Sequence, residues 1–148
     1  MTSKTGLHAI RALTFLAMQK EGTYMGAAAI ADEINAPRNY LGKLMQTLTQ
    51  SGILLSLKGY GGGYALSRSP KEISLFDVID AIEGLGGEPD CFFGWKQCCD
   101  ANPCAIHDRW KHIKAAFYQM LRDVSIENLK SGTIFEEHMN NPFLGSST

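Results

Sequence analysis

The sequence has no long apolar run, which argues against a secreted protein and against a membrane-spanning protein. Its first residues place Lys4, His8 and Arg11 within an amphipathic pattern, so the sequence predicts neither a signal peptide nor a membrane span. No internal repeat is visible along the 148 residues. We therefore expect a cytoplasmic protein that does not contact membranes and that forms one domain, or one domain with an appended element.

Two signatures of catalysis are also absent. The glycines between Lys58 and Tyr64 suggest a phosphate-binding loop at first sight, but no Gly-Lys-Ser/Thr sequence follows them and no helix is predicted after them. No pair of nucleophile and general base is evident, and no substrate pocket is indicated. These absences predict a binding protein, and a small electron carrier or redox enzyme is the less favoured alternative.

Neither sign of charge is in excess, since the formal net charge is −1, but the charges are distributed unevenly. Residues 1–72 hold eight Lys and Arg against four Asp and Glu, which gives +4, whereas residues 73–148 hold six against eleven, which gives −5. A basic first half suits contact with an anion such as nucleic acid. Ordinary surface charge is the other interpretation of the same distribution.

Cysteine is absent from most of the chain, because all four cysteines lie between Cys91 and Cys104. In a cytoplasmic protein such a concentration of thiols indicates metal or redox chemistry more often than a structural disulfide. Asn102 and Pro103 predict an N-cap and a first helical residue, so that a long helix begins near Cys104. His107 follows three residues later and would share a helix face with Cys104.

The first half of the chain predicts a helix-turn-helix. Hydrophobic spacing indicates helices over roughly 3–20, 27–34 and 38–50, with a break at Pro37. The third helix has one buried face and one polar face that can form hydrogen bonds, as a recognition helix requires. The predicted buried face consists of Leu41, Leu44, Met45 and Leu48, and the polar face of Arg38, Asn39, Lys43, Gln46, Thr47 and Gln50.

A β-hairpin is predicted directly after these helices, with strands over 53–57 and 64–66 and a glycine-rich turn between them. In that position a hairpin is the wing of a winged helix-turn-helix, although a purely structural hairpin with a solvated tip is the alternative. The residues expected to enter the major groove are Arg38, Asn39, Tyr40 and Lys43, and those expected to hold phosphates or the adjacent minor groove are Lys58, Tyr60 and Arg68.

The second half of the chain predicts a helix that pairs with another helix. Ser74 and Asp77 have the spacing of a capping box that opens a fourth helix. On the long helix, apolar residues repeat in steps of four and three, which is a heptad seam. Packing onto its own domain is the alternative, but the first three helices already have partners, so we expect a second copy of the chain to cover the seam. The seam residues are Ile106, Trp110, Ile113, Phe117, Met120 and Val124.

These features together resemble the IscR/NsrR type of winged-helix regulator, the Rrf-two superfamily, over residues 4–130. The resemblance rests on Ala9-Ile10-Arg11-Ala12-Leu13 in the first helix, Tyr40-Leu41 at the start of the recognition helix and Gly61-Gly62-Gly63-Tyr64 in the wing. It implies a mainly α winged helix-turn-helix fold and a homodimeric transcription factor that binds a palindromic site on double-stranded DNA. Many such proteins hold an iron–sulfur cluster on the cysteine loop and sense cluster supply, iron, nitric oxide or redox state.

The resemblance also implies a set of ligands. The family typically has five residues between successive cysteines, and Cys98 and Cys104 keep this gap, whereas six residues separate Cys91 from Cys98. Use of Cys99 instead would give gaps of seven and four. The member of this family that regulates iron–sulfur cluster assembly has a histidine ligand, and that ligand corresponds to His107 here. The resemblance therefore implies Cys91, Cys98, Cys104 and His107 as ligands, with Cys99 as an alternate, and favours a [2Fe–2S] over a [4Fe–4S] cluster.

His8 is a second alternate for the fourth ligand. Some relatives take a carboxylate ligand from the first helix of the partner subunit, and this chain has Leu7 at about that position, with His8 next to it. A ligand from that helix would join the cluster of one protomer to the DNA-binding domain of the other.

We predict from these observations a dimeric DNA-binding regulator that senses redox, iron, nitric oxide or cluster status through an iron–sulfur cluster. The alternative is a cluster-free regulator of the same family, in which the vicinal Cys98 and Cys99 oxidise directly or bind zinc. The expected organisation is a winged helix-turn-helix domain over 1–84, a cysteine-rich loop over 85–104, a dimerisation helix and a short C-terminal helix over 105–139, and a flexible tail over 140–148.

Overall fold

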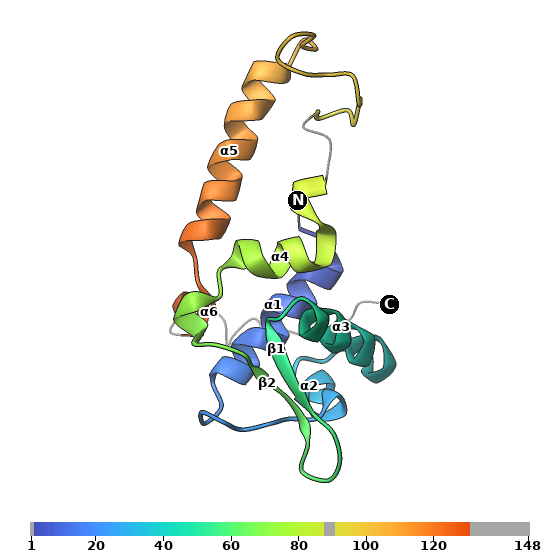
Figure 1. The fold of residues 1–148 in the computed structure, drawn as a ribbon, viewed down its shortest axis with the longest axis vertical. Helices are drawn as coiled ribbons and strands as arrows, with labels where there is room; N and C mark the ends of the chain where they lie inside the picture. The colour runs from blue at the N-terminus through green and yellow to red at the C-terminus, as the bar shows by residue number, and fades with distance from the viewer. Residues whose placement is uncertain (1, 88–90, 131–148) are drawn as a thin grey trace.

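The fold is mainly helical, with one two-stranded antiparallel sheet (Figure 1). The computed structural model describes residues 2–87 and 91–130, so the predicted tail over 140–148 and the end of the predicted dimerisation segment lie outside the described residues. The elements in chain order are α1 (Lys4–Ala17), α2 (Ala27–Glu33), α3 (Arg38–Gln50), β1 (Leu54–Leu57), β2 (Gly63–Leu66), the 3₁₀ turn η1 (Pro70–Glu72), α4 (Leu75–Glu83), the 3₁₀ turn η2 (Leu85–Gly87), α5 (His107–Asp123) and α6 (Ile126–Lys130).

The helix-turn-helix is built from α2 and α3, which pack on α1. The predicted buried face of α3 is confirmed, because Leu41, Leu44, Met45 and Leu48 are its four buried residues. Asn35, between the two helices, adopts a positive φ of 55°, which lets the chain reverse direction before α3 begins. These apolar residues join those of α1, α4 and α6 in one hydrophobic core.

The hairpin is held against the helices on one side. Its register pairs Leu54 with Leu66 and Leu57 with Gly63. The other edge of β2 pairs with the loop before α2, since Tyr64 donates its N–H to the Met25 carbonyl at 2.8 Å and accepts from the Met25 N–H at 3.0 Å. The predicted hairpin after the recognition helix is therefore present, and the end of β2 next to the turn is fixed to the loop before α2.

Gly63 is required at this junction, and its replacement by alanine is expected to lower the free energy of unfolding by at least about 2 kcal/mol. Its φ is +141°, and a Cβ there would overlap the Met25 carbonyl. Backbone strain of this kind costs about 1–3 kcal/mol, and the overlap adds to it.

Urea unfolding followed by circular dichroism measures this loss. Gly42→Ala is the matched control, because nothing lies within 4 Å of that position on α3, and alanine favours a helix interior by about 0.5–1 kcal/mol. A Gly63→Ala protein as stable as wild type would contradict the assignment.

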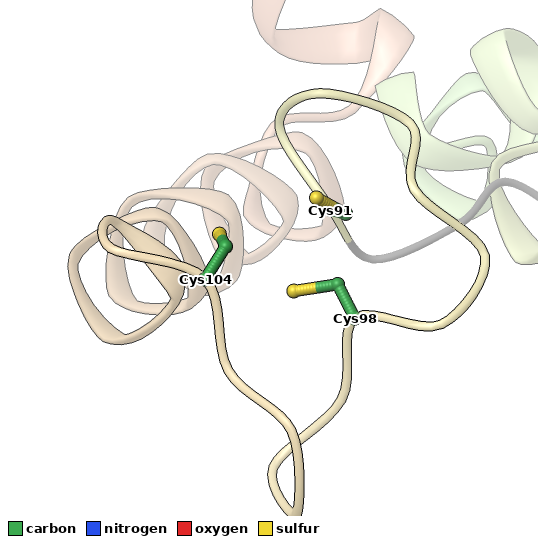
Figure 2. A group of neighbouring side chains, drawn as sticks. All are labelled: Cys91, Cys98 and Cys104. Carbon is green, nitrogen blue, oxygen red and sulfur yellow. The ribbon is translucent and has the colours of Figure 1, made fainter.

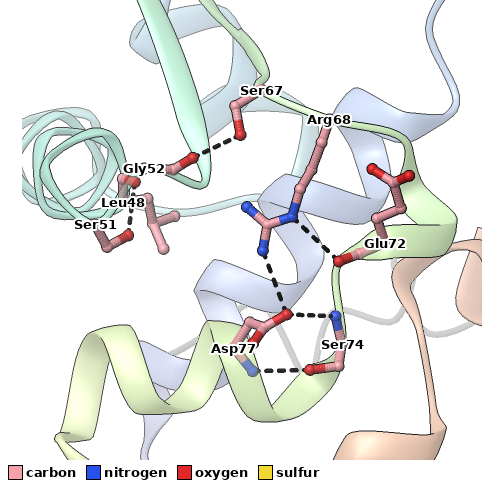
Figure 3. Close-up of polar contacts among 8 residues, drawn as sticks. All are labelled: Leu48, Ser51, Gly52, Ser67, Arg68, Glu72, Ser74 and Asp77. Carbon is pink, nitrogen blue, oxygen red and sulfur yellow. Dashed lines mark hydrogen bonds and ion pairs between the residues drawn. The ribbon is translucent and has the colours of Figure 1, made fainter.

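The predicted capping box of α4 is confirmed, and it also holds the base of the hairpin (Figure 3). Ser74 Oγ accepts from the Asp77 N–H at 3.0 Å, and the Asp77 carboxylate accepts from the Ser74 N–H at 3.1 Å. Arg68 donates to the same carboxylate at 3.3 Å and to the Glu72 carbonyl at 3.1 Å. Arg68 was expected at the DNA backbone, but its guanidinium is engaged in joining the end of the hairpin to α4.

The prediction that the long helix begins near Cys104 is wrong by three residues, because α5 begins at His107 with Ile106 as its N-cap. Asn102 does not cap the helix. Its backbone instead pairs with that of Cys99, with the Asn102 N–H donating to the Cys99 carbonyl at 3.0 Å. Pro103 disfavours helical backbone at the residue before it, which suits this turn. Cys104 and His107 therefore share no helix face.

The helix α5 connects the cysteine loop at one end of the molecule to the DNA-binding domain (Figure 1). Its end is fixed there by backbone hydrogen bonds, because Leu75 donates to the Val124 carbonyl and Ile126 donates to the Ile73 carbonyl, both at 2.9 Å. Ile126 is fully buried in the core. Within residues 2–87 and 91–130, no helix combines the length and the apolar character needed to cross a membrane.

Candidate metal centre and nucleic-acid interface

Three of the four cysteines converge on one point. The Sγ atoms of Cys91, Cys98 and Cys104 all lie within 4.8 Å of one another, and the three thiols are free (Figure 2). Three thiolates on one tetrahedral ion stand about 3.8 Å apart, given Zn–S bonds of about 2.3 Å. The three sulfur atoms are therefore close to the separation at which they share a metal or a small cluster.

Tight turns bring these thiols together. Gly94, with a φ of +73°, donates its N–H to the Cys91 carbonyl at 2.9 Å, and Cys98 donates to the Trp95 carbonyl at 3.1 Å. The Cys99–Asn102 turn then reverses the chain toward Cys104. The loop is thus held by its own backbone hydrogen bonds, and its turns bring Cys98 and Cys104 close to Cys91.

The electrostatics of Cys91 and Cys98 fit a site for a cation. Burial alone would raise the pKa of the Cys91 thiol, but the backbone N–H groups of Trp95 and Phe93 and the neighbouring thiols lower it. The Cys104 N–H favours the Cys98 thiolate, yet burial and the two neighbouring sulfurs raise the pKa of Cys98 to about 11. The pKa of Cys91 is thus lowered while that of Cys98 is raised, in part because neighbouring thiolates repel, and a bound cation would remove that repulsion.

His107 lies beside this group of sulfurs. Its Nδ1 is 3.2 Å from Cys98 Sγ, its Nε2 is 2.9 Å from Asp100 Oδ1, and its side chain is only 5% exposed. Two of the expected ligands, Cys98 and His107, are therefore in contact. The expected shared helix face of His107 and Cys104 does not exist, because α5 begins at His107. Lys111 donates to both oxygens of Asp100 at 2.9 Å.

The two alternate residues lie elsewhere. Cys99 is exposed and is not among the three converging thiols. His8 is 4% exposed, with its Nδ1 3.2 Å from the Tyr40 hydroxyl and the two rings packed edge to face. Burial, and then the positive charges of Arg11 and Lys4, lower the pKa of His8. Its ring thus joins α1 to the recognition helix within one protomer.

The donor set suits an iron–sulfur cluster or another soft metal. Thiolates are the usual ligands of iron–sulfur clusters and zinc, and imidazole binds both metals. Trp110 packs edge to face on Phe92, the neighbour of Cys91, and its buried indole N–H has no hydrogen-bond partner among the described residues. A buried N–H without an acceptor lowers the stability of the folded protein. Sulfur atoms can accept a hydrogen bond from such a group.

The expected DNA-contacting residues of α3 are only partly available. Asn39 and Lys43 are exposed. Arg38 is also exposed, but its guanidinium binds the Asp32 carboxylate through two hydrogen bonds of 3.0 and 2.6 Å, which lower the pKa of Asp32. Tyr40 is half-buried against the core and His8. At the hairpin tip, Lys58 and Tyr60 are exposed, Tyr60 fully so.

The heptad seam on α5 is partly exposed in the protomer. Ile113 and Met120 are 59% and 49% exposed. Trp110 and Phe117 are half-buried. A different face of α5 packs on the protomer itself, where Tyr118 contacts Phe76 of α4 at 5.6 Å between ring centroids. Packing of α5 on its own domain is therefore observed on this face, and the pairing of the seam with a second copy stays a prediction.

Two residues of the site were missed from the sequence, Asp100 and Lys111. They border a cavity of about 350 Å³ between the cysteine loop and α5, together with Cys98, Cys99, His107, Lys114, Ala115 and Tyr118. Asp100 follows the vicinal cysteines directly, so an acid beside predicted ligands was the available signal.

Comparison with known proteins identifies transcriptional regulators as relatives of this chain. A family described as Rrf2, iron-dependent transcriptional regulator, matches residues 2–132. The HTH-type transcriptional regulator IscR of Vibrio atlanticus is 26% identical over 137 residues, which are 92% of this chain and 78% of that protein. IscR of Pectobacterium carotovorum is 27% identical over 129 residues, which are 87% of this chain and 77% of that protein.

Solved structures share the fold. The structure of CymR, titled the global cysteine regulator of B. subtilis, superposes with a TM-score of 0.74 at 24% identity and covers 88% of this chain and 96% of that one. IscR of T. potens superposes with a TM-score of 0.69 at 22% identity, covering 87% of this chain and 85% of that one. The winged-helix architecture expected from the sequence is thereby confirmed.

Proposed function

The chain belongs to the Rrf2 family of transcriptional regulators, and on that premise we propose that it is a homodimeric DNA-binding regulator whose DNA affinity depends on an iron–sulfur cluster. The related proteins regulate transcription, and this chain is a regulator and not an enzyme. The observation that carries the proposal is the convergence of Cys91, Cys98 and Cys104 next to the helix that joins the loop to the DNA-binding domain.

The proposed ligands are the three converging thiols and His107. The 3.2 Å contact of His107 with Cys98 favours it over His8, whose ring is buried against Tyr40. Three thiolates and one imidazole favour [2Fe–2S] over [4Fe–4S], since histidine ligation is best known on [2Fe–2S] centres. When bound, the cluster supplies a redox-active and labile group that responds to oxidants, nitric oxide or iron supply.

The residues of the chain provide a route from that site to the DNA. The helix α5 has 17 residues, so it is a rod about 25 Å long. It starts at His107 and ends where Leu75 and Ile126 hold it to the domain core. A change at the cysteine loop would tilt this rod. In a dimer, that tilt would change the spacing of the two recognition helices on a palindromic site.

The proposed DNA surface consists of the exposed polar residues of α3 and the tip of the wing. Asn39 and Lys43 are suited to the major groove, and Lys58 and Tyr60 to phosphates or the minor groove. Arg38 would join them by exchanging Asp32 for a base or phosphate. Arg68 is left out, because it binds Asp77.

Salt dependence tests this surface. Lys58→Ala should weaken binding to all sequences and reduce the slope of log affinity against log salt by about 2, one unit for each protomer. Lys43→Ala should in addition relax sequence preference, if Lys43 reaches a base edge. Lys71→Ala removes the same charge from η1 and should leave the slope unchanged. Equal slopes for Lys58→Ala and Lys71→Ala would reject the proposed wing contact.

A cluster-free regulator is the second candidate, favoured by one observation. Cys99 is exposed next to the half-buried Cys98, so one thiol of a vicinal pair is accessible at the same loop. Zinc would also accept three thiolates and one imidazole in a tetrahedral site. Metal and acid-labile sulfide analysis of anaerobically purified protein separates the two candidates, because only a cluster contains sulfide.

A further inference from the structure

Asp100, His107 and Lys111 form a hydrogen-bonded array next to the converging thiols. Asp100 Oδ1 lies 2.9 Å from His107 Nε2, and both Asp100 oxygens accept from Lys111 Nζ at 2.9 Å. Lys111 thus donates to both oxygens of Asp100, which is the geometry of a carboxylate paired with an ammonium group. A carboxylate only accepts hydrogen bonds, so the proton of the contact with His107 lies on Nε2.

The position of that proton decides what Nδ1 can do. In a neutral imidazole with Nε2 protonated, Nδ1 carries the free lone pair. Nδ1 is the atom 3.2 Å from Cys98 Sγ, on the side of the converging thiols. The His107 side chain is 5% exposed, so the ring has little freedom to turn and exchange its two nitrogens.

We propose that Asp100, held by Lys111, is a positioning residue that fixes the Nε2–H tautomer and the orientation of His107 and thereby presents Nδ1 as a metal ligand. The arrangement is that of a carboxylate behind a metal-binding histidine, which orients the ring and raises its basicity. This inference rests on the proposed function for the identity of the bound group, but the tautomer itself is a property of the cluster-free protein.

The first test uses that property. Nitrogen-15 NMR of the His107 ring in anaerobic, metal-free protein should show the Nε2–H tautomer in wild type and loss of that preference in Asp100→Ala. Asp108→Ala is the matched control, because Asp108 is exposed in the first turn of α5 and no hydrogen bond joins it to His107 among the described residues. The Asp100 side chain is 73% exposed, so its loss should not unfold the protein.

The second test measures the loaded protein. Loss of a carboxylate behind a metal-bound histidine typically lowers metal affinity 10–100-fold. Asp100→Ala should therefore lose its cluster to a chelator roughly 10–100 times faster than Asp108→Ala, and Lys111→Met should show a smaller change in the same direction. The midpoint potential should also shift in Asp100→Ala and not in the control.

The outcomes separate the two proposals. An unchanged His107 tautomer in Asp100→Ala overturns the positioning role, and so does a cluster as durable as that of Asp108→Ala. A wild-type protein that contains zinc, or no sulfide, overturns the iron–sulfur assignment alone. The tautomer measurement then decides the role of Asp100 by itself.

Discussion

Cys98→Ala is expected to abolish cluster binding, whereas Cys99→Ala is expected to leave it intact. The Cys98 sulfur converges with those of Cys91 and Cys104 and lies 3.2 Å from His107 Nδ1, whereas Cys99 is exposed and is not among the converging thiols. Removing one of four ligands leaves an incomplete coordination shell, so we expect iron and acid-labile sulfide to fall to about a tenth of wild type or less, given losses of 10-fold and more for far weaker perturbations.

The measurement is iron, sulfide and the visible absorbance spectrum of proteins purified without oxygen. The two variants form a matched pair, since they remove the same thiol from adjacent positions. If Cys99→Ala loses the cluster while Cys98→Ala keeps it, the ligand register is shifted by one residue and the convergence of the three sulfurs is not the binding site.

Ile113→Asp combined with Met120→Asp is expected to convert the protein from dimer to monomer. Both side chains are about half exposed in the protomer, so the carboxylates cost little in the isolated chain. In a dimer they would be buried without partners, at a cost of several kcal/mol each. A monomer engages only one half-site, and its affinity for a palindromic site should fall by at least about 100-fold.

Sedimentation velocity at micromolar concentration measures the change. His112→Asp combined with Gln119→Asp is the control, because it places two carboxylates at the same spacing on an exposed face of α5 rotated away from the seam. A soluble Ile113→Asp, Met120→Asp protein that remains dimeric would reject the seam as the interface. Loss of the dimer in the control as well would place the interface on another face.

Local patterns predicted most of the DNA-binding domain. The buried face of α3 and the capping box at Ser74 follow from contacts within one or two helical turns, which sequence spacing specifies directly. The glycine at 63 was predicted as part of a hairpin turn, but its main constraint, the Met25 backbone, comes from a loop nearly forty residues away. The spacing of residues along the sequence does not predict a contact between segments so far apart in the chain.

The errors in the site have the same origin. Asn102 and Pro103 have the local preferences of a helix start, yet the pairing of Cys99 with Asn102 takes precedence and moves the start to His107. Arg68 looked free on the wing because its partner Asp77 belongs to the next helix. Asp100 was missed because its role depends on a histidine seven residues away, across a turn.

The affinity of the protein for DNA should depend on whether the cluster is bound. Wild-type protein, cluster-loaded or depleted by a chelator under the same anaerobic conditions, is titrated by fluorescence anisotropy against a site selected from random DNA. We expect the two affinities to differ about 5–150-fold, the usual range of coupling between two sites, and we expect the chelator to leave the affinity of Cys98→Ala unchanged. Equal affinities of loaded and depleted wild-type protein, with the cluster verified by iron and sulfide content, would contradict this dependence.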